Sequence, residues 1–218
     1  MKKKKFSNRF GRVAHALLAP LIRLCLRVRI HGRENIPSKG GAVVAINHIS
    51  FLDAIVVSAS FPGARMPRYL AKAELFRIPV VSTLIRALGA IRIDRGGSDV
   101  GAVRRAIEVV DGGEMLGLFP QGTRRKGKNP ADTPIKPGVA MIAAKAKCPI
   151  LPVCIRIKKQ RYSFLRRVDV IIGKPLMPEP LGLLSENPNY HEAATTAFRE
   201  LCALGGYTPS LLPESTDK

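Results

Sequence analysis

The chain has 218 residues, the size of one domain, and 46% of them are hydrophobic, enough for a buried core. This composition excludes a disordered chain, a collagen and a small disulfide scaffold. The 36 Lys and Arg exceed the 16 Asp and Glu by 20, which favours a phosphate-bearing partner. The cysteines show no CxxC or Cys–His spacing, so we expect reduced core thiols and no structural zinc at Cys25, Cys148, Cys154 and Cys202.

Half of the net charge lies in residues 1–33, which contain ten Lys or Arg and no Asp or Glu. The apolar stretch 13–22 is too short to span a bilayer, which needs about 20 apolar residues. It is followed by further arginines and by no signal-peptide cleavage site. We therefore expect residues 1–25 to form a basic amphipathic helix that lies on an anionic membrane surface. The alternative is a solubilising basic tail before a core helix.

Apolar runs and periodic segments then alternate along the chain. Strands are predicted at 26–30, 42–46, 68–72, 90–92, 115–119, 150–155 and 168–172, and helices at 53–59, 79–88, 98–110, 139–147 and 190–204. This alternation predicts a single α/β domain over 26–204, with a mainly parallel mixed sheet flanked by helices. Residues 205–218 are expected to be a flexible tail.

The first polar segment after a buried strand is 47–53, with sequence NHISFLD. A histidine at a strand end and a carboxylate five residues later, His48 and Asp53, can meet side chain to side chain. The carboxylate would hold the proton on one ring nitrogen and raise the basicity of the other. The alternative is a capping histidine with an aspartate that stabilises the helix N-terminus. The pattern alone leaves both interpretations open.

The second polar segment is 119–125, with sequence FPQGTRR, again directly after a buried strand. Gly122 would let the backbone approach a ligand closely, and Arg124 offers a planar fork for phosphate. Further positive charge follows at Arg125, Lys126 and Lys128. A surface turn with solvated charges is the alternative.

These segments resemble the conserved blocks of the glycerolipid acyltransferase family, and most closely those of bacterial 1-acyl-sn-glycerol-3-phosphate acyltransferases. The family's NHxSxxD block matches 47–53, its arginine-bearing strand end matches GAIRIDR at 89–95, its FPEGTRS block matches 119–125, and its proline-centred strand matches PILPV at 149–153. A family-like KAEL occurs at 72–75. The resemblance extends from about residue 32 to residue 175, with the blocks in the family's order.

The resemblance implies that His48, oriented by Asp53, removes the proton from a lysophospholipid hydroxyl as that hydroxyl attacks an acyl thioester. Arg124 and Lys72, with Gln121, Gly122 and Thr123, would bind the acceptor phosphate. Weaker candidates for substrate binding are Asn47, Ser50, Arg92 and Arg95, and Pro152 would shape a wall on the acyl-donor side. The resemblance implies no metal or cofactor, with acyl-CoA or acyl-ACP as co-substrate.

Two features depart from this pattern or lie outside it. Gln121 stands where the family usually has Glu, and we interpret it as a hydrogen-bond acceptor rather than a second base. Arg125 replaces the usual Ser. A basic stretch without acid, at Arg156, Lys158, Lys159, Arg161, Arg166 and Arg167, is either a headgroup- or carrier-facing patch or a solvated hairpin.

The sequence thus predicts a peripheral enzyme on the cytoplasmic face of the cell membrane that makes phosphatidic acid from 1-acyl-sn-glycerol-3-phosphate, with the acyl carrier protein as a possible partner. One alternative is a family enzyme with another lysolipid acceptor. Another is an inactive lipid-binding protein of the membrane surface. Nucleic acid is not an expected partner, because the chain has no Trp and only 6% aromatic residues with which to stack bases.

Overall fold

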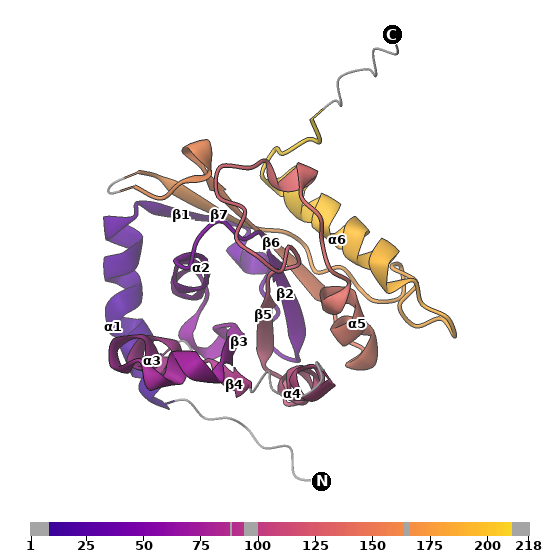
Figure 1. The fold of residues 1–218 in the computed structure, drawn as a ribbon, viewed down its shortest axis with the longest axis horizontal. Helices are drawn as coiled ribbons and strands as arrows, with labels where there is room; N and C mark the ends of the chain where they lie inside the picture. Colours follow the sequence, from indigo (N-terminus) through magenta and orange to yellow (C-terminus); the bar gives the residue numbers. More distant parts are fainter. Residues whose placement is uncertain (1–8, 88, 94–99, 164–165, 211–218) are drawn as a thin grey trace.

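The computed structural model describes residues 9–87, 89–93, 100–163 and 166–210 (Figure 1). Its strands are β1 (Val28–His31), β2 (Ala42–Ile46), β3 (Arg68–Lys72), β4 (Ile91–Ile93), β5 (Met115–Leu118), β6 (Ile150–Ile157) and β7 (Val168–Ile172). Its α-helices are α1 (Arg9–Cys25), α2 (Asp53–Ser60), α3 (Pro79–Ala87), α4 (Val100–Asp111), α5 (Gly138–Lys145) and α6 (Tyr190–Leu204).

The strands form one sheet of seven, in the order β1-β7-β6-β2-β5-β3-β4. Every neighbouring pair is parallel except β6 and β7, which run antiparallel as a hairpin. The predicted α/β class with a mainly parallel mixed sheet is therefore confirmed. β2 lies at the centre, and all five of its residues are buried, as expected for a strand covered on both faces.

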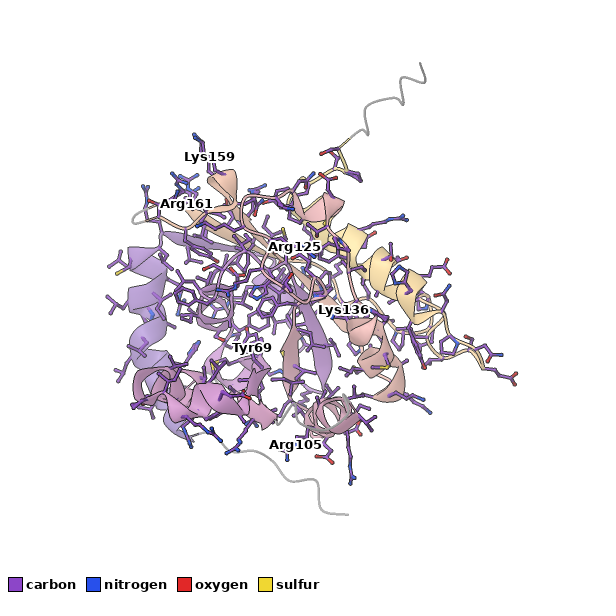
Figure 2. The ribbon with its side chains drawn as sticks, viewed as in Figure 1. Tyr69, Arg105, Arg125, Lys136, Lys159 and Arg161 are labelled. Carbon is purple, nitrogen blue, oxygen red and sulfur yellow. The ribbon has the colours of Figure 1, made fainter. Side chains whose placement is uncertain are left out.

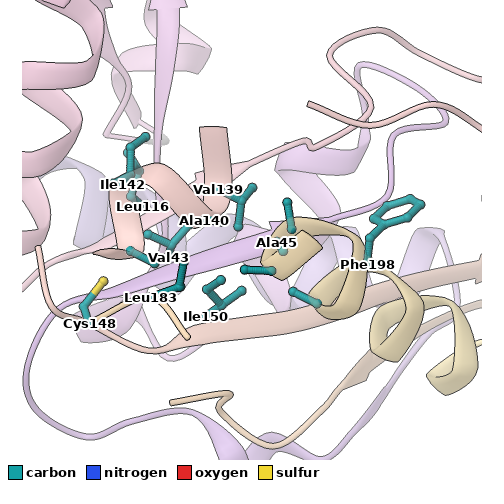
Figure 3. Packing of buried hydrophobic residues seen from close by; sticks show 14 of the residues in the cluster. Val43, Ala45, Leu116, Val139, Ala140, Ile142, Cys148, Ile150, Leu183 and Phe198 are labelled. Carbon is teal, nitrogen blue, oxygen red and sulfur yellow. The ribbon is translucent and has the colours of Figure 1, made fainter. Parts of the chain in front are cut away.

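Helices cover the two faces of the sheet, and alternate residues of β2 point to opposite faces. Val43 and Ala45 pack with α4, α5 and α6 (Figure 3), whereas Val44 and Ile46 pack with α2. α1 and α3 lie outside α2, on the left of Figure 1. The apolar runs that predicted buried strands thus supply the middle layer of a three-layer domain.

The sheet brings two distant segments together at one edge. β2 and β5 are parallel neighbours, with Ala45 opposite Leu118. Their carboxyl ends consequently meet at the same edge, where loops of open α/β sheets carry functional groups. The segments 47–53 and 119–125, which are 65 residues or more apart in the chain, both start there.

Several predicted boundaries shift by one or two residues, for reasons visible in the backbone. β1 begins at Val28 rather than residue 26, because Arg27 adopts a left-handed conformation with φ of 45°. α5 ends at Lys145 rather than residue 147, where Lys147 is again left-handed with φ of 47°. The predicted start of α4 at residue 98 lies outside the described residues.

The described part of the predicted tail, residues 205–210, is hydrogen-bonded to the domain, and its flexibility stays a prediction. The backbone N–H of Ser210 donates to Asp132 at 2.8 Å, and Asn129 donates to the Thr208 carbonyl at 2.7 Å. The side chains of Asn129 and Asp132, at the 3₁₀ helix 130–132, thus hold residues 208–210. Residues 211–218 lie outside the described part.

Cysteine burial follows the prediction for three of the four thiols. Cys148, Cys154 and Cys202 are buried, and Cys25 is exposed at the end of α1. Burial raises the pKa of Cys148 to about 11 and that of Cys202 to about 12, so both thiols stay protonated at neutral pH.

α1 directs apolar side chains away from the protein. Ala19 is buried against the domain, and the His15 ring contacts the Ser58 carbonyl at 2.9 Å. The opposite side exposes a stripe formed by Val13, Leu17, Leu18, Leu21 and Leu24, and Leu17 and Leu24 are each more than 70% exposed. We call these five residues the apolar stripe. No helix in the described part of the chain is long and apolar enough to span a bilayer.

Candidate active site

The site is built around the carboxylate of Asp53, the first residue of α2, which is completely buried. Oδ2 accepts hydrogen bonds from the backbone N–H groups of Ile49 and Ser50, at 2.6 and 2.8 Å, and lies 2.8 Å from Nδ1 of His48. The Asp53 carboxylate thus organises the loop before α2 and contacts the His48 ring, whereas no side chain caps α2.

A second donor reaches Asp53 from a segment far away in the sequence. The Tyr162 hydroxyl, on the loop between β6 and β7, donates to Oδ1 at 2.9 Å. Burial, followed by the Asp53 charge and this hydrogen bond, raises the pKa of Tyr162 well above its ordinary value. The hydroxyl therefore keeps its proton at neutral pH. Sequence reasoning missed Tyr162, because nothing in the local pattern joins residues 109 positions apart.

The backbone of His48 is fixed on both sides, and its ring is fixed by stacking. Its N–H donates to Oε1 of Gln121 at 2.6 Å, and its carbonyl accepts from the N–H of Arg125 at 2.7 Å. Its ring stacks on Phe119 with the two centroids 4.0 Å apart. The 119–125 segment thus holds the 47–53 segment by two hydrogen bonds and one ring contact. The ring remains partly exposed at 18% of its side-chain surface.

Gln121 is 3% exposed and uses both ends of its amide. Besides accepting from His48, it donates through Nε2 to the Thr133 hydroxyl at 2.6 Å. That hydroxyl in turn donates to the Pro130 carbonyl at 2.6 Å. With Thr133 already donating elsewhere, its oxygen is an acceptor, and an amide supplies the donor that a carboxylate lacks. Thr133 is a second residue that sequence reasoning missed.

Two weaker candidates in the first segment have local structural partners. Asn47 is completely buried, and its amide exchanges two hydrogen bonds with the backbone of Ile155 in β6, at 2.7 and 2.9 Å. The structure thus places Asn47 between β2 and β6, away from a surface that a substrate could reach. The Ser50 hydroxyl accepts from the N–H of Leu52 at 3.3 Å and is half-buried.

The phosphate-binding candidates of the second segment lie at the surface beside His48. Gly122, Thr123 and Arg124 are exposed, and Gly122 adopts the left-handed conformation with φ of 68°. A side chain at Gly122 would be strained there and would crowd the Lys136 side chain. The turn therefore presents Arg124 on a compact loop, whose neighbour Arg125 lies near the centre of the view in Figure 2.

The remaining predicted residues are spread along the sheet. Lys72 ends β3, and Arg92 lies in the short edge strand β4 with an exposed side chain. Arg95 lies outside the described residues. Pro152 is buried in β6 opposite Ala45 of β2 and does not line the cavity beside His48.

That cavity, of about 170 Å³, adjoins the histidine and is otherwise apolar or aromatic. His48, Phe51, Phe119, Tyr69, Leu70 and Ile85 contribute to its lining. Phe51 is 68% exposed at its mouth, although it lies only three residues from His48. The arrangement therefore places a polar, partly exposed ring nitrogen next to a hollow suited to hydrocarbon.

Comparison with known proteins identifies relatives over most of the chain. A profile of the acyltransferase family, described as "Acyltransferase", matches residues 27–156. A 1-acyl-sn-glycerol-3-phosphate acyltransferase of Bacillus subtilis is 28% identical over 151 residues, which cover 68% of this chain and 73% of the relative. One of Borreliella burgdorferi is 34% identical over 60% of this chain and 51% of its own length. The chain thus spans between half and three quarters of these two relatives.

A solved structure agrees with the fold. The 1-acyl-sn-glycerophosphate acyltransferase PlsC from Thermotoga maritima superposes with a TM-score of 0.68 at 27% sequence identity. The match covers 96% of this chain and 86% of the other.

The bonding of Gln121 predicts how substitutions there affect stability. Gln121→Ala would leave the partly buried His48 N–H without its partner, and we expect it to lower the free energy of unfolding by about 1–3 kcal/mol. Gln121→Glu keeps the acceptor for His48 and should cost less. Urea denaturation of both variants measures the two values. Equal destabilisation by Ala and Glu would contradict the role of Oε1 as the acceptor.

Proposed function

The chain belongs to the acyltransferase family, and we propose that it transfers a fatty acyl group from acyl-ACP or acyl-CoA to the sn-2 hydroxyl of 1-acyl-sn-glycerol-3-phosphate. The product would be phosphatidic acid, an intermediate of phospholipid synthesis. The observation that carries the proposal is the His48–Asp53 pair beside an apolar cavity and an arginine-bearing loop. The names of the relatives from Bacillus subtilis and Borreliella burgdorferi support the choice of acceptor.

The histidine would act as a general base. Asp53 lies at Nδ1, so that nitrogen carries the ring proton and Nε2 is free to accept one. Nε2 takes the proton of the sn-2 hydroxyl while the hydroxyl oxygen bonds to the thioester carbonyl carbon. The C–S bond then breaks, and the imidazolium returns the proton to the departing sulfur. Asp53 stabilises the imidazolium that exists between these two transfers.

The cavity beside His48 would hold part of an acyl chain. Its lining is apolar or aromatic apart from the histidine, and Phe51 and Phe119 would flank the thioester carbonyl. Burying a methylene group contributes about 0.8 kcal/mol, so even a short length of chain would position the reacting carbonyl.

The loop after β5 would hold the acceptor's phosphate. Arg124 is exposed on this loop, and Arg125 on the same loop bonds through its N–H to the His48 carbonyl. Because the loop is fixed to His48, a phosphate bound there lies at a defined place relative to the base. Lys72 at the end of β3 is a further candidate for the same phosphate.

Gln121 acts in this proposal as a positioning residue. Its amide is buried, and its two ends bond to His48 and Thr133, which suits a role in holding the loop. The departure from the family's usual Glu is therefore compatible with activity.

We also propose that the protein works as a peripheral enzyme on the cytoplasmic face of the membrane, where lysophospholipid acceptors lie. The apolar stripe of α1 faces away from the domain, which costs hydrophobic free energy in water unless a membrane covers it. Ten basic residues in the first 33 would add attraction to anionic headgroups.

The catalytic proposal is tested by release of free thiol from palmitoyl-CoA and from acyl-ACP, with and without 1-acyl-sn-glycerol-3-phosphate. We expect acceptor-dependent release that His48→Ala lowers by roughly 10²–10⁴-fold, the usual contribution of a general base. A panel of other lysophospholipids identifies the acceptor.

The matched control is His191→Ala, which removes an exposed histidine on α6 and should leave the rate unchanged. Circular dichroism verifies that both variants remain folded. Full activity of His48→Ala would refute the mechanism. Lipid binding without thiol release for any acceptor would instead indicate an inactive lipid-binding protein.

Membrane association is tested with vesicles that contain anionic lipid. The double variant Leu17→Glu/Leu24→Glu places charge in the apolar stripe, and we expect its vesicle affinity to fall at least roughly tenfold, because each lost leucine removes about 1.5–3 kcal/mol of burial. Met177→Glu/Leu184→Glu changes two exposed apolar residues after β7 and serves as control. Equal binding of the two double variants in co-sedimentation would argue against α1 as the docking helix.

A further inference from the structure

A second hollow, of about 470 Å³, lies between the β6–β7 hairpin and the loop after β5. Its lining includes four basic residues, Arg156, Lys158, Lys159 and Arg167, together with Gly127 and Asp169. We call it the basic cleft. Figure 2 shows Lys159 at the top of the molecule, with Arg161 just below it.

The charges in the cleft do not balance. Asp169 is its only carboxylate in the described part of the chain, and both of its oxygens are engaged, by His31 at 3.1 Å and by Arg156 at 3.4 Å. Lys158, Lys159 and Arg167 make no ion pair with any described residue. Three cations around one hollow repel one another, and an anion bound between them would remove that repulsion.

The turn that carries these lysines is held in a conformation that side chains disfavour. Lys159 and Gln160 both have positive φ, 59° and 46°, in the left-handed region that side chains disfavour. Gln160 keeps the turn in place. Its side-chain Nε2 donates to the Tyr207 hydroxyl at 2.6 Å, and its backbone carbonyl accepts from the N–H of Gly127 at 3.4 Å. Such strain persists where surrounding contacts enforce it, as they do here.

The cleft adjoins the candidate active site through both of its walls. Gly127 belongs to the loop that carries Arg124, three residues earlier. Tyr162, two residues after Gln160, bonds to Asp53. A ligand that fills the cleft therefore lies next to the segments that hold the base.

We propose that the basic cleft binds the phosphate end of the acyl donor, the phosphate that free CoA and the phosphopantetheine arm of a carrier protein share. The inference rests on the proposed function. An acyl thioester has its reacting carbonyl at one end of a long arm and its phosphate toward the other, so the two ends need separate subsites. The cavity beside His48 takes the acyl end, and the loop with Arg124 takes the acceptor's phosphate. The cleft supplies the third subsite.

Lipid headgroups are the other source of phosphate, and the arrangement favours the donor. The cleft is tied to the two loops that hold His48 and Asp53.

The experiment removes two of the unpaired cations with Lys158→Gln/Arg167→Gln. Calorimetry measures CoA binding without acceptor, and steady-state kinetics measure KM and kcat with palmitoyl-CoA and with acyl-ACP. We expect the dissociation constant of CoA to rise roughly tenfold, and likewise the KM of whichever donor, palmitoyl-CoA or acyl-ACP, supports transfer. The kcat should stay within twofold of that of the unchanged protein. The control, Lys145→Gln/Lys174→Gln, removes two exposed charges elsewhere and should change neither value.

Two results would overturn the inference. In one, CoA affinity and the KM of both donors stay within twofold of the unchanged protein. In the other, only binding to anionic vesicles falls, which would assign the cleft to lipid headgroups.

Failure of the proposed function gives a different pattern. If the unchanged protein transfers no acyl group yet binds CoA, and the double variant weakens that binding tenfold, the phosphate site stands and the transferase assignment fails.

Discussion

The buried carboxylate of Asp53 is the constraint on which the rest of the site depends. Burying a charge is costly unless it is fully hydrogen-bonded, and this carboxylate receives two backbone N–H groups, the His48 ring and the Tyr162 hydroxyl. These partners come from the loop before α2 and from the β6–β7 loop. Satisfying this one carboxylate therefore fixes the shape of the first loop, the orientation of the His48 ring and the position of the second loop.

The amide of Gln121 extends this arrangement to a third segment. It joins the His48 backbone to Thr133, and through Thr133 to the turn at Pro130. A glutamate carboxylate has no N–H to donate to the Thr133 hydroxyl, which itself donates to Pro130. This chain's departure from the family block therefore has a local structural explanation. The loop with Arg124, His48 and the basic cleft are consequently parts of one hydrogen-bonded unit.

Local pattern predicted most of the fold and the centre of the site. Apolar runs and alternating segments located the strands of the described sheet, and the parallel pairing of β2 and β5 brings His48 and Phe119 together. What the sequence could not supply were contacts across long separations. Tyr162 and Thr133 have no motif, and the burial of Asn47 against β6 depends on strand order. Left-handed residues such as Arg27 carry no sequence signal either, because arginine is rare in that conformation.

The tautomer of His48 tests the account most directly. Nitrogen-15 NMR of the imidazole, at a pH where the ring is neutral, distinguishes a proton on Nδ1 from one on Nε2. We expect the proton on Nδ1 in the unchanged protein, held by Asp53, and loss of this preference in Asp53→Asn. A neutral His48 with its proton on Nε2 would contradict it, since no basic nitrogen would then face the substrate hydroxyl.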